Sequence, residues 1–229
     1  MTKSYFVTGT DTEVGKTVAS MAIMQAVAKA GYSVVGYKPV AAGSKETEDG
    51  PMNSDAIRLR ECTTVDVDYE EVNPSLLHAA CSPHIAAELE NTTVDFAQLS
   101  RGLKNIQTKA DFTLVEGAGG WRVPVSYDST LADWVGQEKL PVILVVGIKL
   151  GCLNHAYLTA EAVRRDGLEI VGWVANRVNP GTEHYSDIVK TLEHHLGVPK
   201  LGEIPYMPAI KSRDLSGYID ISPLGLSPV

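Results

Sequence analysis

The sequence has few cysteines, no excess of basic residues and no long uninterrupted apolar run. Its three cysteines, Cys62, Cys81 and Cys152, are too few and too scattered for a disulfide framework or a zinc site. The net charge is −8 at pH 7 with no cluster of Lys and Arg, which argues against binding to nucleic acid or anionic lipid. The longest apolar run, 140–148, is far shorter than the roughly 20 residues that span a bilayer. With no secretory signal at the N-terminus either, we expect a cytoplasmic protein without a membrane segment.

The chain does have the composition of a globular protein. Hydrophobic residues make up 44% and charged residues 21% of it, which supplies enough apolar side chains for a sizeable core. The length of 229 residues favours one large domain over two small ones, and no composition shift or low-complexity tract marks a linker. We therefore predict that residues 1–229 form a single domain.

Apolar runs alternate with helical patterns along the chain, which predicts an α/β fold with a mostly parallel sheet and helices on both faces. The apolar runs are largely continuous rather than alternating, as expected for strands buried on both faces. Strands are predicted at 5–10, 33–40, 111–116, 140–146, 169–176 and 200–204. Helices are predicted at 16–30, from 53/54, from Ser82-Pro83, from 96 to about 110, near 154–166 and near 183–196. Residues 41–53 have a loop composition, and no element is assigned after Met207.

The strongest functional signal is GTDTEVGKT at 9–17, which follows a predicted strand and opens a predicted helix. Glycines let the backbone approach phosphates closely, and N–H groups at a helix start supply a positive field for them. Lys16 would meet the β- and γ-phosphates, and the Thr17 hydroxyl would ligate Mg2+. Five residues separate Gly9 from Gly15, where the common motif has four. The motif still predicts binding of ATP or GTP, with an ordinary strand–turn–helix corner as the alternative.

Three further charged side chains are predicted to face the phosphates. Glu116 ends an apolar strand and precedes the glycine-rich segment 117–120, and Asp55 lies in the first turn of a helix. Because the carboxyl ends of parallel strands converge on the ligand crevice, both carboxylates are candidate metal ligands. Lys38 ends the second strand and is a candidate for stabilising phosphates or a developing anion. Each has a structural alternative: an acid before a turn, a first-turn acid favoured by the helix dipole, and a solvated lysine.

Five segments together resemble dethiobiotin synthetase, in the same order and at matching spacing over nearly the whole chain. They are TGTDTEVGKT at 8–17, GYKPV at 36–40, VEGAGGW at 115–121, KLGCLNH at 149–155 and GWVAN at 172–176. The extra residue in the phosphate loop is itself a feature of that family. The resemblance implies a P-loop NTPase-type fold and an ATP- and Mg2+-dependent ring closure in biotin biosynthesis. In it, 7,8-diaminononanoate and CO2 become dethiobiotin through a carbamate and a carbamic-phosphoric anhydride, with release of ADP and phosphate.

The resemblance also implies roles for individual residues. Lys16, Lys38 and Thr12 would be catalytic, the lysines by stabilising phosphoryl and carbamate charge. The metal ligands would be Thr17, Asp55 and Glu116. The nucleotide would contact the phosphate loop, both carboxylates and the ends of later strands: Glu13, Val14, Gly15, Lys16, Thr17, Val18, Asp55, Glu116, Gly117, Ala118, Gly119, Asn176, Arg177, Pro205, Tyr206 and Met207. Among these, Asn176 would recognise adenine, a role that its place at a strand end already makes plausible.

The diamine substrate would contact two separate regions of the chain: Thr12, Lys38, Ala42, Gly151, Cys152, Leu153 and Asn154. Position 42 departs from the family, where relatives often carry Ser, and Ala42 removes one possible hydrogen bond. The 151–154 turn follows a strand and opens a helix, with Asn154 as a plausible cap, so its N–H groups suit an anion. The resemblance implies that this turn receives the substrate carboxylate across the interface of a homodimer, so that each site is shared.

Two other classes of ATP-using protein are weighed against this family. A positioning or switch ATPase would carry a Lys early in the phosphate loop, and its membrane-positioning types add a basic amphipathic tail; here 212–229 contains only Arg213 as a basic residue. An amidating enzyme acting on a corrinoid acid would add a glutaminase domain with a nucleophilic Cys, for which the chain leaves no room. Neither class is favoured.

Overall fold

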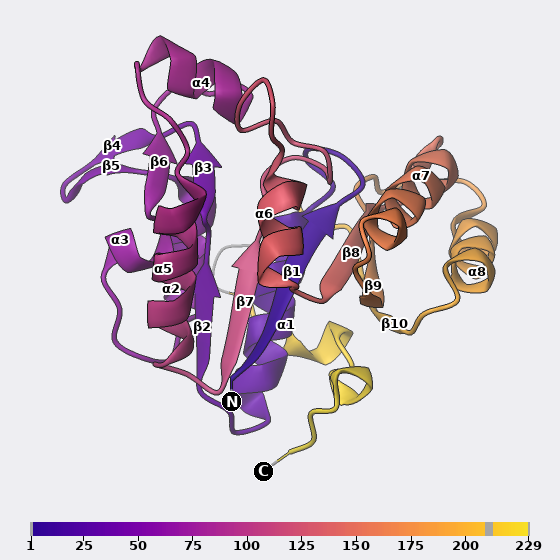
Figure 1. The fold of residues 1–229 in the computed structure, drawn as a ribbon. Coiled ribbons are helices and arrows are strands. Elements are labelled where there is room, and N and C mark those ends of the chain that lie inside the picture. The colour runs from indigo at the N-terminus through magenta and orange to yellow at the C-terminus, as the bar shows by residue number, and fades with distance from the viewer. Residues whose placement is uncertain (1, 209–212, 229) are drawn as a thin grey trace.

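The main sheet consists of six parallel strands in the order β10-β9-β8-β1-β7-β2 (Figure 1). The computed structural model describes residues 2–208 and 213–228. The strands are β1 (Lys3–Gly9), β2 (Val34–Tyr37), β7 (Phe112–Glu116), β8 (Val142–Gly147), β9 (Ile170–Asn176) and β10 (Lys200–Ile204). Every residue of β7 and of β8 is buried, which explains why their apolar runs are continuous. The predicted parallel sheet is confirmed.

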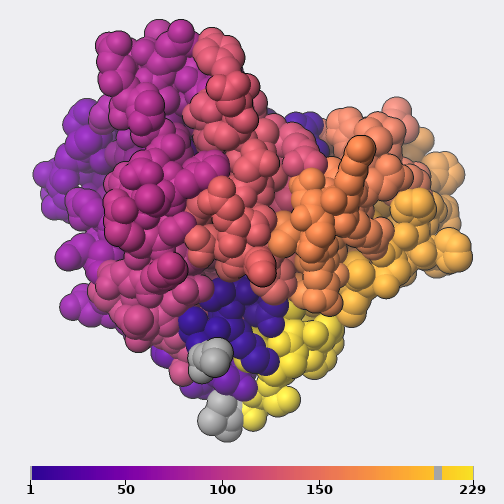
Figure 2. Space-filling view, viewed as in Figure 1, coloured from indigo at the N-terminus to yellow at the C-terminus, as the bar shows by residue number. Residues whose placement is uncertain are grey.

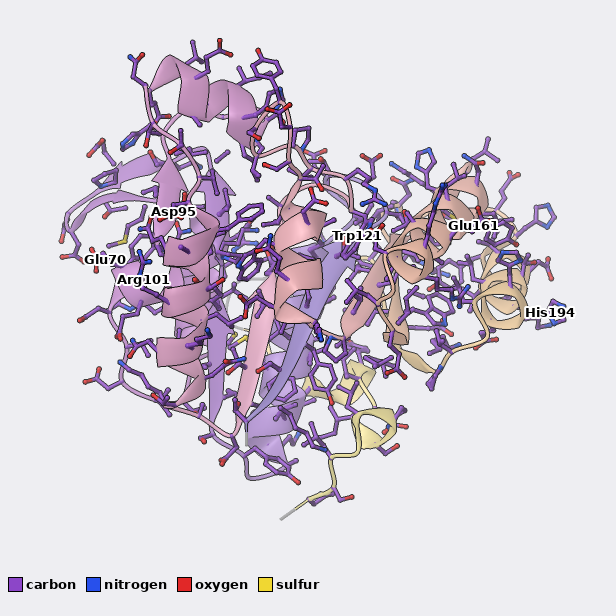
Figure 3. All side chains as sticks on the ribbon, viewed as in Figure 1. Glu70, Asp95, Arg101, Trp121, Glu161 and His194 are labelled. Carbon is purple, nitrogen blue, oxygen red and sulfur yellow. The ribbon has the colours of Figure 1, made fainter. Side chains whose placement is uncertain are left out.

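Helices cover both faces of this sheet (Figure 1). On one face lie α5 (Phe96–Gln107), α6 (Leu131–Glu138) and α7 (Cys152–Arg165), with α8 (Tyr185–Leu196) packed against α7. On the other face α1 (Lys16–Lys29) packs beneath β1, β2 and β7. Side chains on the outer surface, such as Glu161 of α7 and His194 of α8, point away from the sheet (Figure 3). Among the described residues, no helix is long and apolar enough to cross a membrane.

The C-terminal segment returns to the N-terminal strand. It contains the short helices η1 (Ser216–Tyr218) and η2 (Ser222–Leu224), and η1 packs on α1. Lys3 Nζ and Tyr5 Oη both donate hydrogen bonds to the Leu224 carbonyl, each at 3.1 Å. In the space-filling view this segment lies directly beside the N-terminal residues (Figure 2). Residues 213–228 therefore cover the start of β1, at the end of the sheet opposite to the carboxyl ends of the strands.

Small elements lie over the carboxyl end of β2, where the sequence predicted one strand and a loop. The predicted strand 33–40 is interrupted, because Lys38-Pro39 ends β2 and the chain resumes as β3 (Val40–Ala42), paired in parallel with β6 (Ser75–Leu77). Pro39 has no N–H and so cannot continue the ladder. The predicted loop 41–53 contains an antiparallel hairpin, β4 (Lys45–Thr47) and β5 (Gly50–Met52). The remaining helices are α2 (Ser54–Glu61), α3 (Tyr69–Val72) and α4 (Pro83–Leu89).

Candidate active site

The phosphate loop joins β1 to α1 and is held by the end of β9. Gly15 caps α1 in the left-handed conformation, with φ of 87°, which glycine adopts without strain. A Cβ at position 15 would lie 2.0 Å from Asn176 Nδ2. Asn176 Nδ2 donates a hydrogen bond of 2.9 Å to the Val14 carbonyl. The loop is therefore fixed at Gly15 by its backbone conformation and by a side chain from a distant strand.

Lys16 is buried at the start of α1 and held by backbone oxygens. Its Nζ donates to the carbonyl of Gly119, and to that of Asp11 at 3.3 Å. Burial, together with the nearby charge of Lys38, lowers the pKa of Lys16 to about 8, although the carboxylates of Glu116 and Asp55 act in the opposite direction. The Lys16 ammonium therefore loses its proton at a lower pH than an ordinary lysine does, and a bound anion would stabilise its charged form.

Lys38 and Glu116 form a buried ion pair at the carboxyl ends of β2 and β7. The distance from Lys38 Nζ to Glu116 Oε1 is 2.8 Å, and their side chains are 3% and 0% exposed. Nζ also donates to the Gly117 carbonyl at 2.9 Å and lies 3.5 Å from Asp55 Oδ2. Burial alone would lower the pKa of Lys38, but the charges and hydrogen bonds of Glu116 and Asp55 outweigh it and raise this pKa above its usual value. Lys38 is thus a fixed, permanently charged ammonium.

A chain of polar side chains positions Lys38 and Asp55 relative to each other. Asn53 caps α2, with its Oδ1 accepting from the Asp55 N–H at 2.9 Å. The Asn53 N–H donates to Tyr69 Oη at 2.7 Å, and Tyr69 in turn donates to Asn73 at 3.1 Å. Asn73 Nδ2 donates to the Lys38 carbonyl at 2.7 Å. The backbone of Lys38 is therefore linked to the helix start that carries Asp55.

Thr17, Asp55 and Glu116 fit a magnesium ion. Thr17 Oγ1 donates to Glu116 Oε1 at 2.9 Å, while Glu116 Oε2 is buried and has no hydrogen-bond partner among the described residues. An unpartnered buried carboxylate oxygen suits a hard cation. The described residues contain no group of three His, Cys, Asp or Glu that could hold a metal alone. Phosphate oxygens and water would complete the shell, as Mg2+ at nucleotide sites commonly requires.

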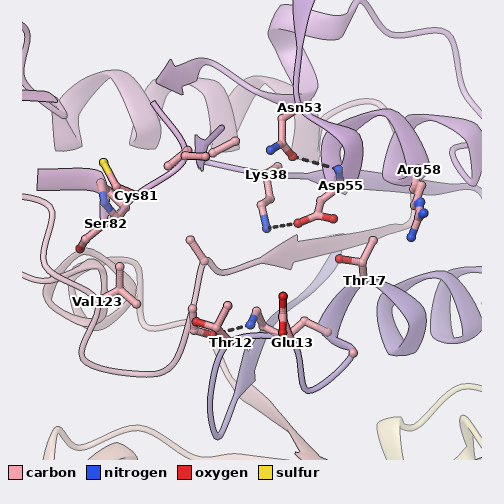
Figure 4. Close-up of a pocket in the computed structure, with 18 of the residues that line it drawn as sticks. Thr12, Glu13, Thr17, Lys38, Asn53, Asp55, Arg58, Cys81, Ser82 and Val123 are labelled. Atoms are coloured by element: carbon pink, nitrogen blue, oxygen red, sulfur yellow. Dashed lines mark hydrogen bonds and ion pairs between the residues drawn. The ribbon is translucent and has the colours of Figure 1, made fainter. Parts of the chain in front are cut away.

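Lys16, Thr17, Lys38 and Asp55 line one cleft with a volume of about 760 Å³ (Figure 4). Its residues come from the phosphate loop, the β2–α2 region, the α4 start and the segment after β7: Thr12, Glu13, Gly15, Lys16, Thr17, Val18, Lys38, Ala41, Ala42, Asn53, Asp55, Arg58, Ala80, Cys81, Ser82, Pro83, Ala118, Gly119 and Val123. Thr12 and Glu13 lie across the cleft from Lys38 and Asp55 (Figure 4). The cleft therefore joins the phosphate loop to a region lined mainly by uncharged side chains, among them Ala42, Ala80 and Val123.

Comparison with known proteins places the chain in a family. Residues 3–213 match the protein family described as an AAA domain. The chain is 59% identical over 224 residues to ATP-dependent dethiobiotin synthetase BioD of Aliivibrio fischeri (strain MJ11), covering 98% of this chain and 99% of that protein. It is also 59% identical to the BioD protein of Vibrio cholerae serotype O1, covering 98% and 97%. The chain belongs to the dethiobiotin synthetase family.

Solved structures with lower sequence identity share the fold. The septum site-determining protein MinD from Pyrococcus horikoshii, complexed with Mg-ADP, matches with a TM-score of 0.56 and 17% identity, covering 100% of this chain and 91% of that one. A ParA family ATPase from Chlorobium tepidum matches with a TM-score of 0.57 and 16% identity, covering 99% and 100%. These likenesses confirm the predicted P-loop NTPase-type fold for this dethiobiotin synthetase family member.

The structure brings most of the predicted site residues together. The cleft contains every predicted residue of the phosphate loop except Val14, together with Lys38, Ala42, Asp55, Ala118 and Gly119. Glu116 and Gly117 lie directly behind it, bonded to Lys38. Asn176, predicted to recognise adenine, and the other predicted nucleotide contacts of this region form a second group at the adjacent ends of β9 and β10. There the Arg177 N–H donates to the Ile204 carbonyl at 2.9 Å, just before Pro205, Tyr206 and Met207, and the Arg177 guanidinium lies 4.0 Å from the Tyr185 ring centre.

The 151–154 turn lies outside the cleft of its own chain. It begins α7, and the prediction that Asn154 caps this helix is wrong. Gly151 is the cap residue, with φ of 89°, and the helix starts at Cys152, which places Asn154 inside the first turn. The preceding residue, Leu150, is 99% exposed.

Several cleft residues were not predicted from the sequence. Asn53, Ala80, Cys81, Ser82 and Val123 belong to connecting segments whose placement depends on distant contacts. Arg58 is different, because it follows Asp55 by three residues on α2. Residues at this spacing share a helix face, so the signal was present in the sequence.

Proposed function

We propose that this chain catalyses ATP-dependent formation of dethiobiotin from 7,8-diaminononanoate and CO2. The observation that carries the proposal is the buried Lys38 ammonium, held between Glu116 and Asp55 at the phosphate loop. A permanently charged group at this point suits a reaction in which anionic oxygens receive a phosphoryl group. The membership of the family and the volume of the cleft agree with it.

The reaction has three steps. One amine of the substrate attacks CO2, forming a C–N bond and, with loss of the amine proton, a carbamate. The γ-phosphoryl group of ATP then moves to a carbamate oxygen, and ADP leaves. Finally the second amine attacks the same carbon, the C–O bond breaks with its electron pair going to phosphate, and the amine proton is lost as the cyclic urea forms. Because phosphoryl transfer depends mainly on positioning and charge stabilisation, no enzyme nucleophile is required.

The three catalytic residues act on different parts of this reaction. Lys16 binds the β- and γ-phosphates and becomes fully protonated against them. Lys38, fixed by Glu116, Asp55 and the Gly117 carbonyl, stabilises the carbamate and the transferring phosphoryl group. Thr12 lies across the cleft from Lys38 and orients the amine (Figure 4). These two walls hold the reacting groups in one geometry.

The nucleotide is held at three places. The phosphate loop, Glu13 to Val18, with Gly117, Ala118 and Gly119, surrounds the phosphates. Thr17, Asp55 and Glu116 would hold Mg2+, which would offset phosphate charge during phosphoryl transfer. Adenine binds at the ends of β9 and β10, against the second group of residues: Asn176, Arg177, Pro205, Tyr206 and Met207.

We also propose that two copies of the chain share each site. The substrate amines lie beside Lys38 and Thr12, while Ala42 and the rest of the cleft accommodate its carbon chain. The carboxylate then reaches the N–H groups at the start of α7, residues 151–154, of a second copy. Leu150 and Leu158 of the same α7 region are 99% and 57% exposed, which suits a face that becomes buried in a dimer.

The three cysteines of the chain are unpaired, with Cys62 and Cys152 partly or fully buried. Free thiols of this kind suit a reducing compartment. We therefore propose that the enzyme acts in the cytoplasm.

The overall function is tested by supplying diaminononanoate, bicarbonate and Mg-ATP and measuring ADP and the cyclic urea together. We expect both products in equal amounts, and neither without the diamine. ADP release that does not depend on the diamine would instead identify a switch ATPase.

The shared site is tested by mixing Lys38→Ala chains with Asn154→Asp chains under conditions of subunit exchange. Asn154 is exposed, so Asp at this position adds a charge that repels the substrate carboxylate without disturbing the fold. One site of each heterodimer then combines both intact halves, and the mixture recovers about a quarter of wild-type activity. Mixing wild-type chains with chains that carry both substitutions also gives about a quarter in a shared-site dimer, but about a half if each site belongs to one chain. The shared site would be refuted if the mixture of the two single variants is inactive and the mixture of wild-type and doubly substituted chains keeps half of the wild-type activity.

A further inference from the structure

Arg58 is a cleft residue to which the reaction above gives no role. It lies on α2 three residues after Asp55, so both side chains project from one face of the helix. Arg58 is half-buried and contributes to the cleft together with Thr17 and Val18. In the close-up, its side chain extends from α2 toward Thr17, and Asp55 lies between Arg58 and Lys38 (Figure 4).

The other cations of the cleft already have partners. Lys38 is paired with Glu116 and Asp55, and Lys16 is held by two backbone carbonyls. Arg58 makes no ion pair with any residue within 2–208 or 213–228. Arg58 is therefore a cleft cation that has no ion-pair partner in the described part of the chain and no role in the reaction above, so its charge is available to a further anionic group.

The position of Arg58 indicates which phosphates of the nucleotide it would contact. In a phosphate loop the N–H groups at the helix start cradle the α- and β-phosphates, while the lysine reaches the β- and γ-phosphates. Arg58 lines the cleft together with Thr17 and Val18 of the first turn of α1. Its side chain extends toward Thr17, on the far side of Asp55 from Lys38 (Figure 4). It thus faces the α/β end of the phosphates and not the end where the phosphoryl group is transferred.

We propose that Arg58 binds the α- and β-phosphates of the nucleotide. This inference rests on the nucleotide site of the proposed function. A guanidinium offers two parallel N–H groups that match two phosphate oxygens, which an ammonium does not. Because both ATP and ADP carry these phosphates, Arg58 determines the affinity for both nucleotides and leaves the chemical step unchanged.

The test compares Arg58→Gln with Arg60→Gln. Arg60 lies on the same helix but is exposed and outside the cleft, so the control removes the same charge two residues away. Affinities for Mg-ADP and for a non-hydrolysable Mg-ATP analogue are measured by calorimetry, with kcat and the KM for diamine at saturating ATP. We expect Arg58→Gln to bind both nucleotides about tenfold more weakly than wild type, with kcat and diamine KM unchanged. Arg58→Lys should recover part of this loss, and Arg60→Gln should match wild type.

Each other result overturns the proposal in a distinct way. Loss of affinity for the ATP analogue alone, with a lower kcat, would place Arg58 at the γ-phosphate. Equal affinities for Arg58→Gln and Arg60→Gln would make Arg58 a solvated surface cation. If wild-type protein binds neither nucleotide, the proposed function itself is refuted, and Arg58 has no ligand to bind.

Discussion

Replacing Lys38 with Met is expected to destabilise the fold and to stop catalysis, for two separable reasons. Met keeps an apolar stem of similar length and removes the ammonium. Glu116, whose side chain is 0% exposed, then loses the cation that lies 2.8 Å from its Oε1. Asp55, the other charged neighbour, cannot replace Lys38 because it is also an acid. The variant therefore carries a buried carboxylate without compensation.

The expected magnitude follows from the burial of both partners. Removing one member of a buried ion pair costs about 3–5 kcal/mol of unfolding free energy. The double variant Lys38→Met/Glu116→Gln removes both charges and is expected to recover most of that loss. Its turnover does not recover, because losing one preorganised group that stabilises developing charge lowers the rate by about 10²–10³.

The two effects are measured on nucleotide-free protein by urea denaturation and, separately, by the rate of ADP formation. Lys109→Met is the control for stability. Lys109 pairs with Glu71 at 2.6 Å, but both side chains are partly exposed, so this change is expected to cost about 1 kcal/mol or less. A Lys38→Met variant as stable as wild type would refute the claim that Glu116 depends on Lys38. A double variant with wild-type turnover would remove Lys38 from catalysis.

Two further substitutions and one measurement of proton uptake test other parts of the site. Glu116→Gln is expected to raise the Mg2+ concentration for half-maximal activity, because a neutral amide is a weaker ligand for a hard cation; an unchanged Mg2+ titration would exclude Glu116 from the metal shell. Gly15→Ala should abolish nucleotide binding, since φ is 87° and the new Cβ would meet Asn176 at 2.0 Å, whereas Gly181→Ala, where a Cβ meets open space, should bind normally. Because the pKa of Lys16 is about 8 in the free protein, ATP binding at pH 8 should take up protons, and this uptake should shrink toward pH 6, where Lys16 is already protonated. Calorimetry in two buffers of different ionisation enthalpy measures the uptake, and a Lys16→Arg variant that takes up as many protons as wild type would contradict the assignment.

The main sheet could be predicted because its strands carry their signal locally. Strands such as β7 and β8 are continuous apolar runs between turn residues, and burial on both faces requires nothing else of them. The small elements could not be predicted in this way, because β3 and β6 have three residues each and exist only through their mutual pairing across the β2–α4 region. The helix α6 was missed despite a local signal, the capping box of Thr130 and Asp133.

The residues of the site also differ in whether their position follows from a local sequence signal or from contacts between distant segments. Lys16, Lys38 and Glu116 stand at strand ends or a helix start, so the topology alone brings them to one edge of the sheet. The connection from Asn53 through Tyr69 and Asn73 to Lys38 has no sequence signature. Its hydrogen bonds join residues up to 35 positions apart, and only the packing of α2 and α3 against β2 makes them possible.

The hydrogen bonds of Glu116 link the two charges on which the proposed chemistry depends. Its Oε1 accepts from both Lys38 and Thr17, whereas its Oε2 is buried and accepts from no described residue. With Glu116 as a Mg2+ ligand, one carboxylate would hold both the Lys38 ammonium and the metal. The distance between the carbamate-stabilising and phosphate-stabilising charges would then depend on a single side chain, which is fully buried at the end of β7 and hydrogen-bonded to Lys38 and Thr17. A site that transfers a phosphoryl group onto a carbamate needs both charges in fixed register, and a shared rigid ligand achieves this with fewer mobile groups than two independent ones.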